Sequence, residues 1–128
     1  MLEKDFDAWN LYKKDLQSFR KQKNFRVGEV WYCSIGINIG RELDGKNKYF
    51  ERPILIIKKF NDEMFWAIPL TSKPKEGRYY HTFYYKGVRE TAILSQLLRS
   101  DIGRLQRMIF RLAEEDVDII RDRIKQLL

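Results

Sequence analysis

The sequence predicts a mainly β protein, a small antiparallel barrel with one helix before it and one after it. Three observations lead to this fold class. Short aliphatic and aromatic runs alternate with polar loops through the middle of the chain, and apolar residues recur at helical spacing near both ends. The chain has 128 residues, a length that suits one compact domain, and it shows neither an internal repeat nor a linker. We therefore expect a single domain over residues 1–128.

The N-terminal helix is predicted from a stripe of apolar side chains. Its members recur three or four residues apart: Phe6, Trp9, Tyr12, Leu16 and Phe19. Asp5 is placed to cap the first turn. The basic run RKQKN ends the segment, which suits the negative pole of the helix dipole. Given its apolar face, we expect this helix to pack on the barrel. The alternatives are that it extends a dimer interface or lengthens an RNA track through its lysines, Lys13, Lys14, Lys21 and Lys23.

The strands are predicted from β-branched, aliphatic and aromatic runs bounded by turn residues. In chain order they are VWYCSI after Gly28, RPILIIKKF, EMFWAIPLT, RYYHTFYY, TAILS and RMIFRL. The second should begin at about Pro53, because proline fits a strand only at its first residue or on an edge. Asn61 and Asp62 supply the turn that follows it. KGVRE is predicted to form a tight turn, and QLLRSDIGRL a short helix or turn.

The last segment is predicted to be an amphipathic helix. Its apolar residues, Val117, Ile120, Ile124 and Leu127, fall on one helical face. Ala113 sits where Ser or Thr would cap the helix, but the acidic residues that follow it suit the first turn.

Charge and cysteine content narrow the function classes. The formal net charge is +7, which favours an anionic partner: nucleic acid first, and an acidic protein segment or a membrane surface second. A basic domain without such a partner is the plainer alternative. One cysteine and one histidine exclude an intrachain disulfide and a Cys/His zinc site, and we expect neither metal nor cofactor. Cys33 is expected to be a small buried hydrophobe. With no signal peptide and no membrane span in the sequence, the cytoplasm is the expected location.

Arg52 is the first candidate for a binding site. Pro53 biases it toward an extended backbone, and a guanidinium at the mouth of a barrel offers a planar fork of donors for phosphate. A surface ion pair with Glu42 or Glu51 is the plainer interpretation. Thr71 and Ser72 place hydroxyls at a strand end, where they either face a ligand or cap the turn.

His81, in YYHTFYY, is the only histidine and has an ordinary pKa near neutrality. A lone histidine between aromatic residues on a strand is usually structural, and catalysis is the alternative. The surrounding rings are mostly expected in the barrel wall, although exposed ones could stack on unpaired bases.

Five short motifs in order resemble the MazF/PemK family of toxins from bacterial toxin–antitoxin pairs. They are Gly28-Glu29-Val30, Gly40-Arg41-Glu42, Arg52-Pro53-Ile54-Leu55, Pro69-Leu70-Thr71, and Ser95-Gln96 with Arg104-Leu105. The resemblance runs from about Phe25 to the C-terminus. It divides the chain into a helical extension, residues 1–24, and a barrel core with the C-terminal helix, residues 25–128.

The resemblance implies an SH3-like barrel that forms a homodimer and cuts single-stranded RNA without a metal. The 2′-hydroxyl attacks the adjacent phosphate, which leaves a 2′,3′-cyclic phosphate and a 5′-hydroxyl. By position Arg52 is the main catalytic residue, which stabilises the phosphate, with delivery of a proton as a second role. Thr71 places a hydroxyl on the scissile group, and Glu42 serves either in proton transfer or in substrate positioning. The expected substrate contacts are Arg41, Ser72, Lys73, His81, Ser95 and Gln96.

Two departures from the family pattern affect these assignments. The insert KNKYFE lengthens the loop before Arg52, so the sequence preference of relatives does not transfer. Ser95 stands where some members place a catalytic Asp, which leaves Glu42 as the leading general base and His81 as the reserve.

The resemblance also implies partners. We expect an antitoxin whose acidic, partly disordered tail folds onto the toxin, with DNA reached only through that antitoxin, and no membrane. One alternative is a gyrase poison of the same fold, although the ending RIKQLL lacks the aromatic and small residues of that group. The other is a non-catalytic nucleic-acid-binding module, because a fold does not fix a function.

Overall fold

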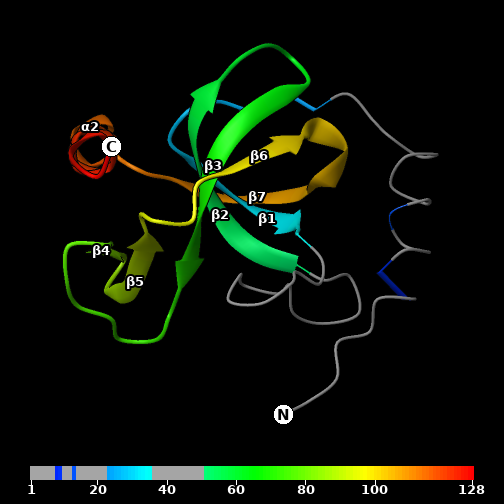
Figure 1. Cartoon of the computed structure of the whole chain (residues 1–128). Coiled ribbons are helices and arrows are strands. Elements are labelled where there is room, and N and C mark those ends of the chain that lie inside the picture. The colour runs from blue at the N-terminus through cyan, green and yellow to red at the C-terminus, as the bar shows by residue number, and fades with distance from the viewer. Residues whose placement is uncertain (1–7, 10–12, 14–22, 36–50) are drawn as a thin grey trace.

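A computed structural model of the chain describes residues 8, 9, 13, 23–35 and 51–128 (Figure 1). Ala8, Trp9 and Lys13 are helical, and Trp9 is buried. The rest of the expected N-terminal helix and the charged loop before Glu51 lie outside the described residues.

The described residues form seven antiparallel strands and a C-terminal helix. The strands are β1 (Glu29–Ser34), β2 (Glu51–Lys59), β3 (Met64–Thr71), β4 (Tyr80–Tyr85), β5 (Val88–Ile93), β6 (Leu98–Asp101) and β7 (Leu105–Arg111). A 3₁₀ turn, Ile102–Arg104, separates the last two strands, and α2 (Glu114–Gln126) follows. The sheet order is β4-β5-β3-β2-β1-β7, with β6 also paired to β3. The predicted mainly β class with a C-terminal amphipathic helix is confirmed.

The sheet bends but does not close into a barrel among the described residues. β5 and β6 both pair with β3, but at different positions along it. Met64–Ala67 pair with β6, whereas Leu70 and Thr71 pair with β5. Because β3 exchanges one partner for the other near Pro69, the hairpin β4–β5 diverges from the rest of the sheet (Figure 1). The two outer strands, β4 and β7, are not paired with each other.

Two turns join paired strands, and a glycine before β1 lets the chain pass α2. Asn61 Oδ1 accepts hydrogen bonds from the amides of Glu63 and Met64 at 2.8 and 2.9 Å, as its turn position predicts. Lys86 and Gly87 have φ of 48° and 78° and form a tight turn of the kind that joins hairpin strands. Gly28 has φ of 93°, and a Cβ there would lie 3.2 Å from Val117 Cγ2, so a glycine is needed where the chain passes α2.

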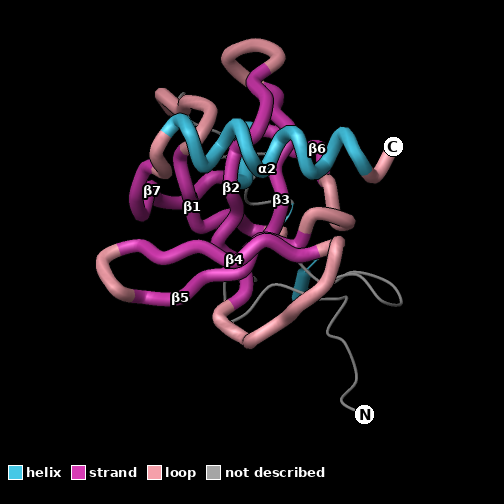
Figure 2. The backbone as a smooth tube through the Cα atoms, turned by 90° about the vertical axis from the view of Figure 1, so that its left-hand side faces the viewer, coloured by secondary structure: helices cyan, strands magenta, loops and turns pink. Residues whose placement is uncertain are grey.

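α2 covers one face of the sheet and buries the larger of two cores. Figure 2 shows the helix lying across β1, β2 and β3. Its buried residues, Val117, Ile120 and Ile124, are those that the apolar spacing predicts. The opposite face of the sheet carries the second core, whose members are Phe25, Trp31, Cys33, Ile35, Ile54, Ile56, Phe65, Ala67, Ile102 and Leu105.

Two strand predictions need correction. The second strand begins at Glu51, two residues before Pro53, so Arg52 is part of the strand. Within QLLRSDIGRL, Leu98–Asp101 form β6 rather than a helix, and only Ile102–Arg104 are helical. The four residues of β6 are held by pairing with β3, a long-range contact that local propensity does not reveal.

Candidate active site

Arg52 and Thr71 project from the same face and the same end of the sheet. The β2–β3 register pairs Ile54 with Pro69, and Arg52 and Thr71 each lie two residues further toward that end. Side chains alternate along a strand, so each shares the face of its neighbour two residues away. Arg52 and Thr71 therefore lie at the same end of two neighbouring strands, beyond the last paired residues Ile54 and Pro69.

This face is the one that α2 leaves uncovered. Along β2, Ile54 and Ile56 belong to the core opposite α2, whereas Leu55 and Ile57 belong to the core beneath the helix. Arg52, two residues before Ile54, lies on the same face as Ile54 and Ile56 and is half-buried. A cation held part-way out of water interacts more strongly with an anion than one in bulk solvent does.

Thr71 continues into a row of threonines across three strands. It pairs with Thr91 of β5, which pairs in turn with Thr82 of β4. The hydroxyls of Thr82 and Thr91 lie 3.2 Å apart. Thr71 is 7% exposed, and its Oγ1 accepts a hydrogen bond from the Lys73 amide at 3.2 Å, which leaves its own proton available for donation. We call Arg52, Thr71, Thr91 and Thr82 the polar row.

Sequence reasoning missed Thr82 and Thr91, although a signal for them is present. The two-residue turn at Lys86–Gly87 fixes the register of the hairpin, and counting back from it pairs Thr82 with Thr91. Joining that pair to Thr71 requires the β3–β5 contact, which no local pattern predicts.

The other candidate site residues lie on segments outside the polar row. Ser72 and Lys73 directly follow Thr71 and are exposed. Ser95 and Gln96 lie in the connection from β5 to β6. Ser95 is exposed and Gln96 is half-buried. Arg41 and Glu42 lie outside the described residues. Their segment joins the end of β1 to the start of β2, the strand that carries Arg52.

The structure places His81 on the opposite face, beneath α2. Its register partner Ala92 belongs to the core under the helix. Its Nδ1 lies 3.1 Å from Arg123 Nη1; because a guanidinium only donates, Nδ1 is the acceptor and the ring is neutral. Burial lowers the pKa of His81 and the charge of Arg123 lowers it further, against a smaller raising effect of Asp116. His81 therefore lies apart from the polar row.

Glu51 and Cys33 are buried residues whose contacts belong to the fold. The Glu51 carboxylate is buried and forms an ion pair with Arg107 at 3.3 Å, and the Arg107 guanidinium stacks over Tyr32 at 4.2 Å. Burial raises the pKa of the Cys33 thiol to about 12, which keeps the sulfur protonated and unreactive. Cys33 is thus a small buried residue, as the sequence predicts.

The described residues contain no group of three His, Cys, Asp or Glu side chains able to hold a metal ion. In the same part of the chain, none of the helices has the length and apolar character required to cross a membrane.

The fold and the polar row define a small basic β-sheet domain with a guanidinium and three hydroxyl groups on the face opposite α2. The family model of the PemK-like, MazF-like toxins of type II toxin–antitoxin systems matches residues 26–128, and the chain belongs to this family. The family predicted from the motifs is therefore confirmed.

Two solved structures show the same fold. An endoribonuclease in complex with its cognate antitoxin, from a Mycobacterial species, is 11% identical, with a TM-score of 0.63 over 80% of this chain and 93% of that one. MazF from Deinococcus radiodurans is 16% identical, with a TM-score of 0.64 over 82% and 96% of the two chains. No curated protein matches the sequence.

Proposed function

We propose that the protein is the toxin of a type II toxin–antitoxin pair and a metal-independent, sequence-selective endoribonuclease that cleaves single-stranded mRNA. One observation carries the proposal: a guanidinium and a hydroxyl, Arg52 and Thr71, leave the same face at the same end of neighbouring strands. Family membership and the likeness to an endoribonuclease structure support it.

The proposed reaction is an internal transesterification. The ribose 2′-oxygen forms a bond to phosphorus while the bond from phosphorus to the 5′-oxygen breaks, which yields a 2′,3′-cyclic phosphate and a 5′-hydroxyl. The 2′-OH proton goes to a base, and the leaving oxygen takes a proton from an acid. Arg52 donates to the non-bridging oxygens, whose charge grows in the transition state, and Thr71 donates one further hydrogen bond.

Glu42 is the proposed general base. His81, the reserve, faces α2, and its ring nitrogen Nδ1 accepts a hydrogen bond from Arg123. Ser72, Lys73, Ser95 and Gln96 are proposed to contact the substrate on either side of the scissile phosphate, together with Arg41.

The first prediction tests the roles of Arg52 and Thr71. Incubated with a mixed-sequence RNA in excess EDTA, the protein should produce cyclic-phosphate ends, which end-group analysis detects. Arg52→Ala should slow cleavage about a hundredfold or more, because a preorganised donor to the developing charge is lost. Thr71→Val should slow it, whereas Thr71→Ser, which keeps the hydroxyl, should largely restore it.

The matched control is Arg111→Ala, which removes a guanidinium from an exposed position on β7. Equal activity of Arg52→Ala and Arg111→Ala would refute the assignment. Tight RNA binding without cutting would indicate a non-catalytic module, and intact RNA with stalled gyrase would indicate the poison.

The proposed biological setting follows from the same membership. The toxin acts in the cytoplasm as a homodimer, and a cognate antitoxin with an acidic tail restrains it. Any link to DNA runs through the antitoxin. The net charge of +7 suits both RNA and an acidic tail.

A further inference from the structure

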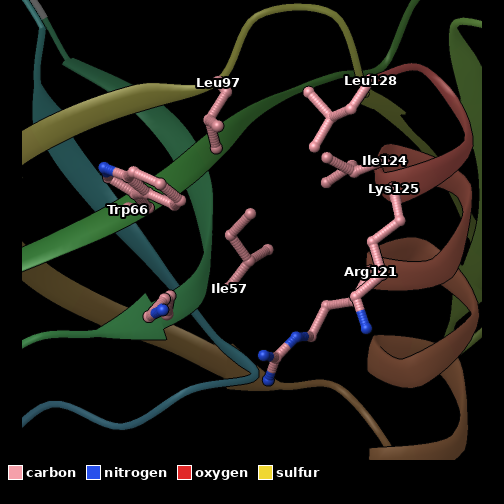
Figure 3. A pocket seen from close by; sticks show the side chains of 8 residues that line it. Ile57, Trp66, Leu97, Arg121, Ile124, Lys125 and Leu128 are labelled. Carbon is pink, nitrogen blue, oxygen red and sulfur yellow. The ribbon is translucent and has the colours of Figure 1, made fainter.

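Two hollows flank the C-terminal half of α2, on the face of the sheet away from the polar row. The first lies between the helix and the sheet, and we call it the basic groove (Figure 3). Its lining combines apolar side chains with three cations: Ile57, Lys58, Trp66, Leu97, Arg121, Ile124, Lys125 and Leu128. The second lies between the helix and the segment that leads into β4.

The second hollow, which we call the arginine pocket, has a largely polar lining without an acidic side chain. Its members are Arg78, Tyr79, Arg123, Gln126 and Leu127. An α-helix has about 3.6 residues per turn. The helical members of this set therefore lie on the opposite side of α2 from Arg121 and Lys125 of the basic groove. The two hollows are separate sites.

Arg123 is held in place by three acceptors and still has donors for a ligand. Its Nη1 donates to His81 Nδ1 at 3.1 Å, and its Nη2 donates to the carbonyl oxygens of Gly77 and Arg78, both at 3.4 Å. A guanidinium carries five N–H groups, so these contacts leave at least two of them for a ligand. A side chain that is fixed in advance loses little conformational freedom on binding. Arg123 is therefore a preorganised donor.

Arg78 and Tyr79 supply further donors from the connection between β3 and β4. Arg78 Nη2 donates to the Tyr79 hydroxyl oxygen at 2.5 Å, and the guanidinium lies over the Tyr79 ring, 4.8 Å from its centroid. Because the phenol oxygen accepts this bond, its own proton remains available for donation. Arg78 is exposed and Tyr79 is 41% exposed, so both can meet a ligand that enters from solvent.

The charge of the pocket favours an anion. Among the residues that the structure describes, no carboxylate forms an ion pair with Arg78 or Arg123, although Glu76 and Asp122 lie close to them in sequence. The carboxyl end of α2 contributes roughly half a negative charge, against two full positive charges. The helix dipole accounts for a cation at Arg123, in the last turn, but not for Arg78, which belongs to another segment.

The volume of the pocket indicates the class of ligand. It is about 310 Å³, at the lower end of the range of roughly 300–1,000 Å³ typical of small-molecule sites. Guanidinium groups suit phosphate, because their planar forks of donors match its oxygens. We infer that the arginine pocket binds the phosphate group of a small phosphate ester. Arg78, Arg123 and the Tyr79 hydroxyl donate to the phosphate oxygens, while the Tyr79 ring and Leu127 contact the organic part.

Isothermal titration calorimetry can test the inference with three probes: inorganic phosphate, a nucleoside 5′-monophosphate, and the same nucleoside without phosphate. The titrations use the unaltered protein and Arg52→Ala, in which the polar row lacks its cation. Both phosphate compounds should bind to both proteins, the ester more tightly, and the nucleoside should not bind. Arg78→Gln/Arg123→Gln should weaken binding about tenfold or more, because charge-assisted hydrogen bonds to phosphate are lost.

The matched control is Arg121→Gln/Lys125→Gln, which removes two charges from the same helix on the side of the basic groove. It should bind the ester as the unaltered protein does. Arg123→Gln also removes the contact with His81, so thermal unfolding checks the fold of each variant. Arg78→Gln alone changes an exposed side chain and should weaken binding about threefold. Equal affinity in Arg78→Gln/Arg123→Gln and in the control would overturn the inference.

Two further outcomes would assign the pocket to another ligand. Equal affinity for inorganic phosphate and the ester would refute the ester and leave a site for free phosphate. Displacement of the ester by an RNA oligonucleotide that lacks a terminal phosphate would assign the pocket to the RNA backbone and overturn the inference. The inference does not depend on the proposed nuclease: Arg52→Ala should lose cleavage and keep ester binding, whereas Arg78→Gln/Arg123→Gln should lose ester binding and keep cleavage.

Discussion

Neighbouring residues of β4 place their side chains on opposite faces of the sheet. Thr82 lies in the polar row with Thr91, whereas its neighbour His81 lies over Ala92 beneath α2. The alternation follows from strand geometry and needs only the register to be known. A histidine and a threonine that are adjacent in sequence therefore belong to two different environments.

His81 should make the stability of the fold depend on pH. Protonation of Nδ1 would remove the hydrogen bond from Arg123 and set two cations side by side. The pKa of His81 in the folded protein lies below 6.5, so below about pH 6.5 the unfolded chain binds a proton that the folded protein does not. The free energy of unfolding should fall as pH drops from this value toward the folded-state pKa, and stay constant above it.

Urea unfolding at a series of pH values measures this effect, with His81→Asn as the reference because its amide oxygen can still accept from Arg123. Burial raises the pKa of Glu90, whose titration acts with the opposite sign, and taking the difference between the two proteins removes that contribution. Parallel stability curves for the two proteins would contradict the assignment.

At the scale of elements, the sequence predicts a helix or strand well where the hydrophobic pattern lies within one short segment. The spacing of Val117, Ile120 and Ile124 predicts both α2 and its buried face. β6 was missed because Leu98–Asp101 lack a strong strand pattern and are held by β3. The same limit applies to the polar row, since Thr71 and Thr91 meet only through a pairing between segments that are distant in sequence.

The docking of α2 should depend on its buried face and hardly at all on its exposed one. Ile120 is 0% exposed, and Ile120→Ala should lower the free energy of unfolding by about 2–5 kcal/mol through lost burial and the cavity that remains. The neighbour Ile119 is 47% exposed, so Ile119→Ala should cost less than about 1 kcal/mol. Chemical denaturation of both variants tests this, and equal losses would mean that α2 does not pack as described.

At the scale of the whole molecule, the open sheet has two faces of different character. The sequence predicts a barrel, because strand patterns show which segments form strands but not which strands pair or whether the outer strands meet. The sheet stays open because one edge of β3 pairs with β6 before Pro69 and with β5 after it. As a result the polar row lies on one face, and α2 with the basic groove lies on the other.

The two faces should differ in how each contributes to RNA affinity. For single strands, each phosphate neutralised by a cation contributes a slope of about −0.7 to the dependence of log K on log salt concentration. Lys73 follows Thr71 directly and is exposed, so Lys73→Gln should lower the magnitude of that slope by about 0.7. Lys125→Gln removes the same charge from the groove on the other face and should leave the slope unchanged. Salt titrations with an RNA that carries a 2′-deoxynucleotide at the cleavage site measure binding without turnover. Equal slopes for the two variants would mean that RNA is attracted by the net charge of +7 as a whole, and not along the face that carries Arg52.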